Sequence, residues 1–415
     1  MARYAIAVLQ GDGIGPEIMR EGVKVLNAVG ERYNHAFDVT YAPFGASAYR
    51  GKGHPFPEET RSLCKNVDGI LKGPVGLPKL NEEITERLGN TLENLTIIEL
   101  RGMHDAFLNI RPVKLPLEFW EFSPLKAERL GEGGIDILMM RELTGGIYFG
   151  DKTWSKNTEG NYAVDECRYT RSQIERFAHE CFKEAQKRNV QLTSASKPNI
   201  LATGKLWDEV FDEVGKKEYS TVPFSKVIVD AHATELCLNP SRYNGVVAYE
   251  NLQGDILTDQ AGGIIGSLGL IPSACINPKS RKGFFEPAHG SAPNIVGQGI
   301  ANPYSMIGCV AFMFDNLGLA EESRLVWQSL QGVFAQSHMT SELVFKLTDI
   351  QKKQRVDRYL AEFLPLHERL GVVNAANRLR AFVEDHYRRI DEEHASRVVS
   401  TSVFGDKVVE SILSA

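Results

Sequence analysis

The chain has 415 residues, of which 43% are apolar and 24% are charged, so it is long enough for two domains with sizeable cores. Its formal net charge is −6. This modest acidic balance gives no basic surface for nucleic acid or for an anionic membrane. The composition therefore predicts a globular protein and excludes the general classes of nucleic-acid-binding and membrane-bound proteins.

The N-terminal segment and the cysteines both favour a cytoplasmic protein. No apolar run approaches the ~20 residues that cross a bilayer. Residues 1–9 lack the apolar region and the small-residue cleavage site of an export signal, and we expect a buried strand there. The six cysteines have no C-x-x-C spacing, which indicates reduced thiols and no zinc site.

Short apolar runs alternate with amphipathic helical patterns over the first two thirds of the chain, which predicts an α/β architecture. Pro16 suits the first turn of a helix. Ser172 and Glu175 have the spacing of a capping box before another helix. Strands are predicted at residues 3–9, 135–140, 190–193, 226–229 and 246–249.

Two later segments have a different composition. Residues 283–303 are dense in Gly, Pro and Asn, which predicts a long functional loop before an apolar helix from about Tyr304. Residues 335–398 are rich in charge and predict a helical appendage. One stripe of this appendage is interpreted as a packing face rather than a ligand site, and it comprises Leu379, Phe382, Val383, His386 and Ile390.

Residues 11–16, Gly-Asp-Gly-Ile-Gly-Pro, follow the first strand and open a helix, as a dinucleotide-binding turn does. The match is poor because the third glycine of G-x-G-x-x-G falls at Pro16, and no acidic strand end follows about 20 residues later. A tight turn between strand and helix is therefore favoured, with a phosphate cradle as the alternative.

Three carboxylates could form a metal site. Asp255 and Asp259 lie four residues apart and would share one face of a helix, and Asp230 follows the predicted strand at 226–229. Brought together, they would suit Mg²⁺ or Mn²⁺. Spacing alone fits solvated surface acids better.

Three arginines stand beside apolar runs, at Arg101, Arg111 and Arg141. Guanidinium groups bind carboxylates in a bidentate manner, so the three together would indicate a polycarboxylate substrate, whereas each alone fits a surface ion pair. Pro112 is expected to block a helix and turn the chain.

Two further side chains could exchange protons. Tyr148 follows a Gly-Gly pair, and Lys197 follows a predicted strand. A tyrosine and a desolvated lysine can act as acid and base when burial or neighbouring charge shifts them. Either residue could equally be structural.

Six motifs follow one another along the chain, at residues 11–17, 109–112, 141–150, 250–259, 266–274 and 289–293. In this order they resemble the β-decarboxylating dehydrogenases, the family of isopropylmalate, isocitrate, homoisocitrate and tartrate dehydrogenases, and most of all its isopropylmalate branch. The resemblance runs over residues 3–330 and resumes at 400–406.

The resemblance implies a two-domain α/β fold that is not the ordinary Rossmann fold, with a helical insertion near the C-terminus. Residues 1–106 and 266–415 would form the cofactor-side domain, and residues 107–265 the substrate and dimerisation domain. The family forms homodimers with shared active sites, in which Lys197 and Asp230 would come from the neighbouring subunit.

The implied activity is metal-dependent, NAD-linked oxidative decarboxylation of a small-molecule 3-substituted malate. The favoured substrate is 3-isopropylmalate, converted to 4-methyl-2-oxopentanoate in leucine biosynthesis. Lys197 would be the base and Tyr148 the acid. The arginines at 101, 111 and 141 would hold the substrate carboxylates, and Mg²⁺ or Mn²⁺ would bind Asp230, Asp255 and Asp259.

Two further sets of residues are implied by position in the family motifs. An apolar wall would accept the alkyl group and disfavour the extra carboxylate of isocitrate, although these residues could simply be core. That wall comprises Ile97, Ile98 and Ile200. The NAD contacts would comprise Asn199, Glu286, His289, Gly290, Ser291, Ala292, Asn294, Ile295 and Asn302.

The sequence departs from the isopropylmalate pattern at Asn94, Gly102, Gln253 and Asn294, and in the insertion before Ser400. Asn294 replaces a ribose-binding Asp, which keeps hydrogen bonding but loses the charge that repels a 2′-phosphate. These departures keep open a paralogue that oxidises another 3-substituted malate in a specialised pathway. A non-catalytic regulatory or scaffold subunit is the third hypothesis, and retention of the implied catalytic residues counts against it.

Overall fold

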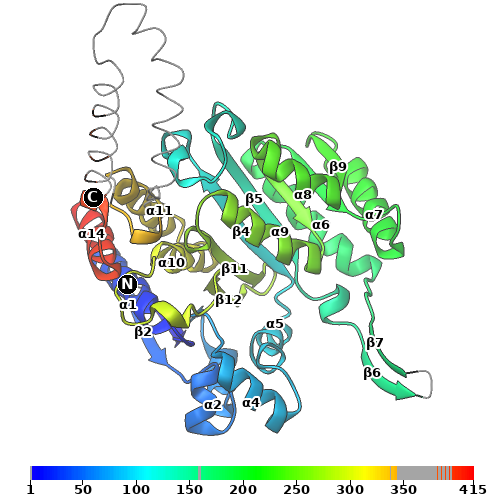
Figure 1. The fold of residues 1–415 in the computed structure, drawn as a ribbon, viewed down its shortest axis with the longest axis horizontal. Coiled ribbons are helices and arrows are strands. Elements are labelled where there is room, and N and C mark those ends of the chain that lie inside the picture. The colour runs from blue at the N-terminus through cyan, green and yellow to red at the C-terminus, as the bar shows by residue number, and fades with distance from the viewer. Residues whose placement is uncertain are drawn as a thin grey trace, which may run out of the picture.

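One large twisted sheet with helices on both faces forms the body of the protein, and a two-stranded arm projects from it (Figure 1). The computed structural model describes residues 2–157, 160–336, 338–343 and 395–415, with the single residues 381, 385, 388 and 392. Within these residues, no helix has both the length and the apolar character needed to cross a bilayer.

The large sheet has ten strands in the order β2-β1-β3-β12-β11-β4-β5-β10-β8-β9, and β6 and β7 pair to form the arm. Neighbouring strands are parallel on both sides of an antiparallel centre, where β11 pairs with β12 and with β4, and β4 pairs with β5. The strands are β1 (Arg3–Leu9), β2 (Ala36–Tyr41), β3 (Gly69–Lys72), β4 (Leu108–Leu115), β5 (Ile135–Glu142), β6 (Lys152–Asn157), β7 (Gly160–Asp165), β8 (Leu192–Ser196), β9 (Phe224–Ile228), β10 (Gly245–Tyr249), β11 (Pro272–Asn277) and β12 (Lys282–Pro287).

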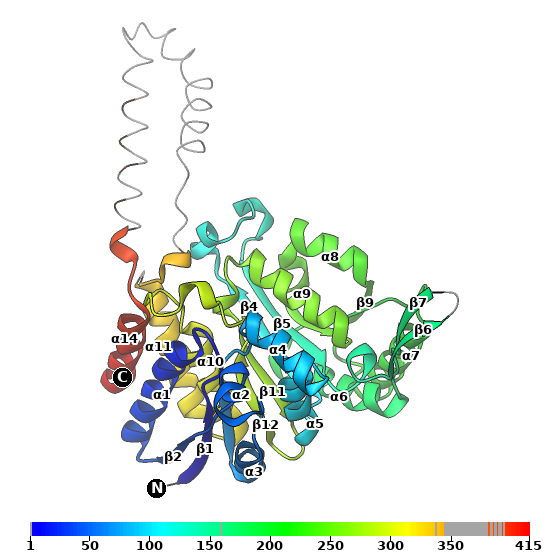
Figure 2. The same cartoon turned by 60° about the horizontal axis from the view of Figure 1, so that its bottom comes forward.

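Helices cover both faces of the sheet, and the last helix returns to the first, so that α14 packs along α1 (Figure 2). The α-helices are α1 (Gly15–Tyr33), α2 (Ala46–Lys52), α3 (Glu58–Asn66), α4 (Pro78–Leu88), α5 (Glu99–Met103), α6 (Arg171–Arg188), α7 (Ala202–Glu218), α8 (Val229–Leu238), α9 (Asn251–Ile264), α10 (Tyr304–Leu317), α11 (Ala320–Ala335) and α14 (Thr401–Ser414).

Alternation along the strands produces a separate core on each face. In β1, Ile6 and Val8 join one buried cluster with α1, α10, α11 and α14, whereas Ala7 and Leu9 join another cluster on the opposite face. Successive side chains of a strand point to opposite faces, so a sheet covered on both sides needs nearly continuous apolar strands. The run at 3–9 meets this requirement.

Most elements expected from the sequence are present. The strand at 3–9 is confirmed, the runs at 135–140 and 246–249 lie within β5 and β10, and α1 begins at Gly15, with Pro16 in its first turn. The runs at 190–193 and 226–229 overlap β8 and β9 with shifted ends. All six cysteines are free thiols.

Four local predictions are wrong. The capping box of α6 is formed by Thr170 and Gln173, because the helix begins at Arg171, before Ser172. Asp230 lies in the first turn of α8 rather than at a strand end. The start of the segment 283–303 belongs to β12, which pairs with β11, so the loop proper begins after Pro287.

Pro112 does not turn the chain, because it lies inside β4. β11 pairs with β4 only at Leu108–Ile110, so Pro112 lies beyond that pairing, where a missing N–H is tolerated. The five side chains of the predicted stripe lie outside the described residues, as does most of the predicted insertion at 335–398. The domain limits at 107 and 265 stay a prediction; they would fall where β11 pairs with β4.

His232 on α8 gives the fold a dependence on pH. It is fully buried, hydrogen bonds with the Tyr249 hydroxyl at 2.7 Å, and lies 4.2 Å from the Tyr243 ring between centroids. Burial lowers its pKa from 6.5 to about 4. As pH falls below 6.5, His232 therefore binds a proton in the unfolded chain but not in the native chain. The free energy of unfolding falls as a result.

We expect His232→Gln to flatten this dependence. Between neutral pH and about pH 5, the wild-type protein should lose about 2 kcal/mol more unfolding free energy than the variant. Urea unfolding at several pH values and one protein concentration measures the difference. Parallel curves for the two proteins would contradict the assignment.

Candidate active site

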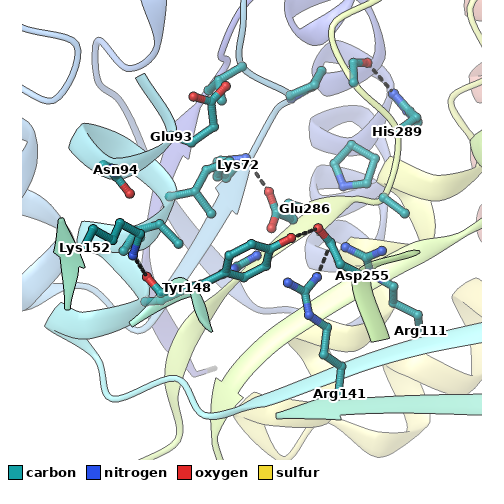
Figure 3. A pocket seen from close by; sticks show the side chains of 18 residues that line it. Lys72, Glu93, Asn94, Arg111, Arg141, Tyr148, Lys152, Asp255, Glu286 and His289 are labelled. Atoms are coloured by element: carbon teal, nitrogen blue, oxygen red, sulfur yellow. Dashed lines mark hydrogen bonds and ion pairs between the residues drawn. The ribbon is translucent and has the colours of Figure 1, made fainter. Parts of the chain in front are cut away.

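A cavity of about 400 Å³ opens between the end of β5, α5, α9 and the segment that follows β12 (Figure 3). The three arginines predicted to act together all line it. Arg101 comes from α5, Arg111 from β4 and Arg141 from β5, so three elements far apart in the sequence bring their guanidinium groups to one place.

These arginines are nearly removed from solvent, with exposures of 6%, 6% and 1% for Arg101, Arg111 and Arg141. Burial, followed by the charge of Arg101, lowers the pKa of Arg141 to about 10. The Nε atoms of Arg101 and Arg111 are buried and have no hydrogen-bond partner among the described residues. Such a cluster of like charges favours an anion with several carboxylates.

Arg141 is held by the first turn of α9. Asn251 Oδ1 accepts hydrogen bonds from Arg141 Nε at 3.0 Å and Nη2 at 2.7 Å, and Asp255 forms an ion pair with Nη1. A Cβ at Gly254 would lie 2.8 Å from Arg141 Cγ, so glycine lets the arginine pass close to the helix. The Glu250 side chain caps α9 by accepting from the Leu252 and Gln253 amides.

Tyr148 lies beside this pair and donates its hydroxyl proton to Asp255 Oδ2 at 2.8 Å (Figure 3). Burial, and then this hydrogen bond, raises the pKa of Tyr148 to about 12. Burial opposes ionisation of Asp255, but the Arg141 charge and the Tyr148 hydrogen bond outweigh it, and its pKa lies below the ordinary value. At neutral pH the site therefore holds a protonated phenol beside a carboxylate.

Asp259, one turn further along α9, lies near the same group. Arg111 Nη1 donates to Thr258 Oγ1 at 2.6 Å and reaches Asp259 Oδ1 at 3.2 Å. Burial raises the pKa of Asp259 above its ordinary value. The predicted shared helix face of Asp255 and Asp259 is confirmed, and both carboxylates are directed to arginines.

The cavity also contains charged groups that the sequence analysis did not single out. Lys72, at the end of β3, forms a buried ion pair with Glu286 on β12. Burial opposes ionisation of Glu286, but the Lys72 charge keeps its pKa below the ordinary value. Glu93 and Lys152 line the cavity together with Asn94, Ile97, Ile98 and Val75.

The last residue of β12 and the segment that follows form one wall, through Pro287, Ala288, His289 and Gly290. The Nε2 atom of His289 is buried and finds no hydrogen-bond partner in the part of the chain that the structure describes, and the same is true of Asn302 Nδ2. Buried polar atoms without partners are exceptional, so this segment offers hydrogen bonds to a polar ligand. Ser291 is buried, Asn294 is exposed, and Ala292 and Ile295 are half-buried.

Half of the predicted site residues lie outside the cavity lining. They are Lys197, Asn199, Ile200, Asp230, Asp259, Ser291, Ala292, Asn294, Ile295 and Asn302. Lys197 pairs with Asp230, and this partner lowers the pKa of the exposed Asp230. Ile200 is 72% exposed. Among the described residues, no three carboxylate, histidine or cysteine side chains of one chain come together as a metal site.

Comparison with known proteins decides the family. A family model for isocitrate/isopropylmalate dehydrogenase matches residues 5–358. The chain belongs to the isocitrate/isopropylmalate dehydrogenase family. It is 40% identical to the 3-isopropylmalate dehydrogenases of Carboxydothermus hydrogenoformans, over 86% of this chain and 94% of that protein, and of Bacillus subtilis, over 81% and 91%.

Solved structures agree with this dehydrogenase family. The isocitrate dehydrogenase of Methylococcus capsulatus is 25% identical, with a TM-score of 0.74 and 99% of each chain covered. A β-decarboxylating dehydrogenase of Thermococcus kodakarensis is 30% identical, with a TM-score of 0.63 over 84% of this chain and 93% of that one. The predicted family, fold class and enzyme class are confirmed.

In this dehydrogenase, three residues at the site were not predicted from the sequence: Asn251, Lys72 and Lys152. Asn251 belongs to the motif at residues 250–259, shortly after a strand. Its position at the start of a helix could have indicated a role at the site. Lys72 ends an apolar strand, so an isolated charge there was also visible. Lys152 donates to the backbone carbonyl of Tyr148 at 2.9 Å, a contact for which the sequence gives no signal.

We expect Asn251→Ala to loosen Arg141 and to raise the substrate KM, lowering kcat/KM by about 10- to 100-fold. Asn244→Ala is the matched control, because Asn244 bonds the backbone of Asp136 and Gly134 at the opposite end of β10. Steady-state kinetics and thermal unfolding of both variants distinguish the two roles. Equal losses of activity in both would contradict the positioning of Arg141 by Asn251.

Proposed function

We propose that the protein catalyses metal-dependent, NAD-linked oxidative decarboxylation of a 3-substituted malate, with 3-isopropylmalate converted to 4-methyl-2-oxopentanoate in leucine biosynthesis. The observation that carries the proposal is the cavity in which Arg101, Arg111 and Arg141 surround Tyr148 and Asp255. The names of the relatives at 40% identity support the same substrate.

The arginine cluster suits a dicarboxylate, and one side of the cavity suits an alkyl group. Ile97 and Ile98 both line the cavity. Two carboxylates bound by guanidinium groups would leave C3 and its substituent toward this apolar surface. Burying an isopropyl group there is favourable, whereas burying an unpaired carboxylate is expensive.

The donor sets fit the implied divalent ion and dinucleotide. Asp255 and Asp259 offer carboxylate oxygens, the ligands that Mg²⁺ and Mn²⁺ prefer, and Asp230 of the partner subunit would add a third. The unpartnered His289 Nε2 and Asn302 Nδ2 suit the polar groups of a dinucleotide. When bound, the dinucleotide accepts hydride from C2, and the divalent ion withdraws electron density from the oxygen on C2.

The chain's own residues would handle the carboxylates and the protons. The guanidinium groups hold the substrate, and Lys197 of the partner subunit takes the proton of the C2 hydroxyl. After the C3 carboxylate leaves as carbon dioxide, C3 needs a proton. Tyr148 supplies it, since its raised pKa keeps the phenol protonated at neutral pH.

A homodimer with shared active sites explains why Lys197 and Asp230 lie apart from the cavity. Apolar side chains near Lys197 in the sequence, on α8 and on the adjoining α9 are exposed: Ile200 by 72%, Leu238 by 48% and Ile256 by 60%. An exposed apolar surface of this kind favours a protein partner. A second copy bound there would bring Lys197 to the cavity of its neighbour.

A second candidate, oxidation of another 3-substituted malate, is favoured by polar groups in the same cavity. Glu93, Asn94 and Lys72 stand among the apolar lining residues, so the substituent need not be purely alkyl.

NAD is proposed as the dinucleotide because Ile295 lacks the polar character that suits the 2′-phosphate of NADP, although Asn294 carries no charge to repel that phosphate.

We expect purified protein with Mn²⁺ and NAD to oxidise 3-isopropylmalate with kcat/KM at least about tenfold above that for malate, isocitrate, homoisocitrate and tartrate. A spectrophotometric panel with NAD and NADP measures this. Preference for another 3-substituted malate would favour the second candidate. No turnover with any compound and either cofactor would favour a regulatory or scaffold subunit.

Hybrid dimers test the shared site. Lys197→Ala and Asp255→Asn homodimers should each be inactive. A hybrid of the two, purified through a different tag on each subunit, should recover about half of the wild-type activity, because one of its two sites keeps both residues. A doubly tagged Lys197→Ala dimer is the control. An inactive hybrid would show that each site uses residues of one chain only.

A further inference from the structure

The Gly-Asp-Gly motif after β1 has no role in the proposed chemistry, yet its aspartate is 2% exposed. We propose that Asp12 is a positioning residue that holds two wall segments of the cavity, residues 74–75 and 289–290, in the arrangement that binds the dinucleotide. This inference rests on the proposed function, and it assigns the motif a task other than a phosphate cradle.

The Asp12 carboxylate bonds directly to the first wall segment. Its Oδ2 atom accepts from the Gly76 amide at 2.8 Å and from the Ala46 amide at 2.8 Å, and Oδ1 accepts from the Ser47 amide at 2.7 Å. The Asp12 amide donates to the Pro74 carbonyl at 2.8 Å. Hydrogen bonds to Asp12 at Pro74 and at Gly76 thus flank Val75, and both Pro74 and Val75 line the cavity.

The second wall segment is tied to the same residues. The Ile14 amide donates to the Ser291 carbonyl at 2.9 Å, and Ser291 Oγ donates to the Gly76 carbonyl at 2.5 Å. His289 and Gly290, directly before Ser291, line the cavity. A closed ring of contacts therefore joins three loops, through Asp12, Gly76, Ser291 and Ile14. The Ser291 hydroxyl donates its proton inside this ring.

The glycines of the motif serve this loop contact. Gly13 has φ +58°, and a Cβ there would overlap the Ser291 carbonyl. The amides of Asp12, Ile14 and Gly15 already donate to carbonyls of the chain. A phosphate cradle needs free amides and no nearby carboxylate, so these contacts exclude that alternative.

Three backbone donors compensate the buried carboxylate, and hydrogen bonds to a charged acceptor are about twice as strong as neutral ones. In Asp12→Asn, the amide nitrogen would face at least one backbone N–H and leave it unpaired. The loss acts first on the position of residues 73–76, and through Ser291 on His289 and Gly290.

The test compares Asp12→Asn with wild type in the full-length protein, using NADH and NADPH fluorescence titration, steady-state kinetics and hydrogen–deuterium exchange. We expect the Kd of the preferred dinucleotide and its KM to rise about tenfold, with less than about a twofold change in the KM of the malate substrate. Exchange of the amides at 73–76 and 288–291 should rise in the absence of any ligand.

Asp68→Asn is the matched control. Asp68 Oδ2 accepts from the Ala5 amide at 2.8 Å, at the opposite end of β1. This variant should leave dinucleotide affinity and exchange at 288–291 unchanged. Should Asp12→Asn fail to fold, Ser291→Ala removes one contact of the ring and should produce the same pattern more weakly.

Two results would overturn the inference: unchanged dinucleotide affinity in both ring variants, or exchange at 288–291 equal to that of wild type. If wild type binds neither NADH nor NADPH, the proposed function fails. The exchange measurement then still decides whether Asp12 positions the two segments.

Discussion

The mutual repulsion of three buried guanidinium groups is the constraint on which this site depends. Arg101, Arg111 and Arg141 are each at most 6% exposed, so bulk water solvates their charges poorly. Carboxylates of the chain balance these charges instead. Asp255 pairs with Arg141, and Asp259 with Arg111. Each pairing uses an oxygen that a divalent ion would otherwise take, so arginines and metal would compete for the same acids until a substrate dianion binds between them.

Because of that competition, the charges of the arginines and of the divalent ion would be balanced together only when an anionic substrate is bound. With substrate carboxylates on the guanidinium groups, Asp255 and Asp259 would be released toward a cation. Tyr148 donates to Asp255, so a change at this carboxylate also changes the acid beside it. In the proposed function, Asp255 would therefore couple substrate binding, metal binding and proton supply.

The loops around the cavity share a second device, a buried acid at or just after the C-terminal end of a strand. Asp12 follows β1, Glu142 ends β5 and Glu250 follows β10. Glu142 and Glu250 accept backbone amides of the loop or helix that comes next, whereas Asp12 accepts the amides of Ala46, Ser47 and Gly76. Burial raises the pKa of both Glu142 and Glu250. Glu142 thus fixes the turn that leads to Tyr148, and Glu250 fixes the start of α9, the helix that carries Asp255.

Sequence reasoning succeeded where the cause is local and failed where it is not. Apolar runs predicted β1 and β5, and four-residue spacing predicted that Asp255 and Asp259 share a face of α9. The pairing of Lys72 with Glu286 joins residues 214 positions apart, and no periodicity reports it. Pro112 was misplaced for the same reason: whether a strand tolerates proline depends on how far its neighbour β11 extends. The sequence also shows the Gly-Asp-Gly motif, but its glycines approach loops more than 60 and 270 residues away. The sequence pattern does not report such distant contacts, so it does not explain the glycines.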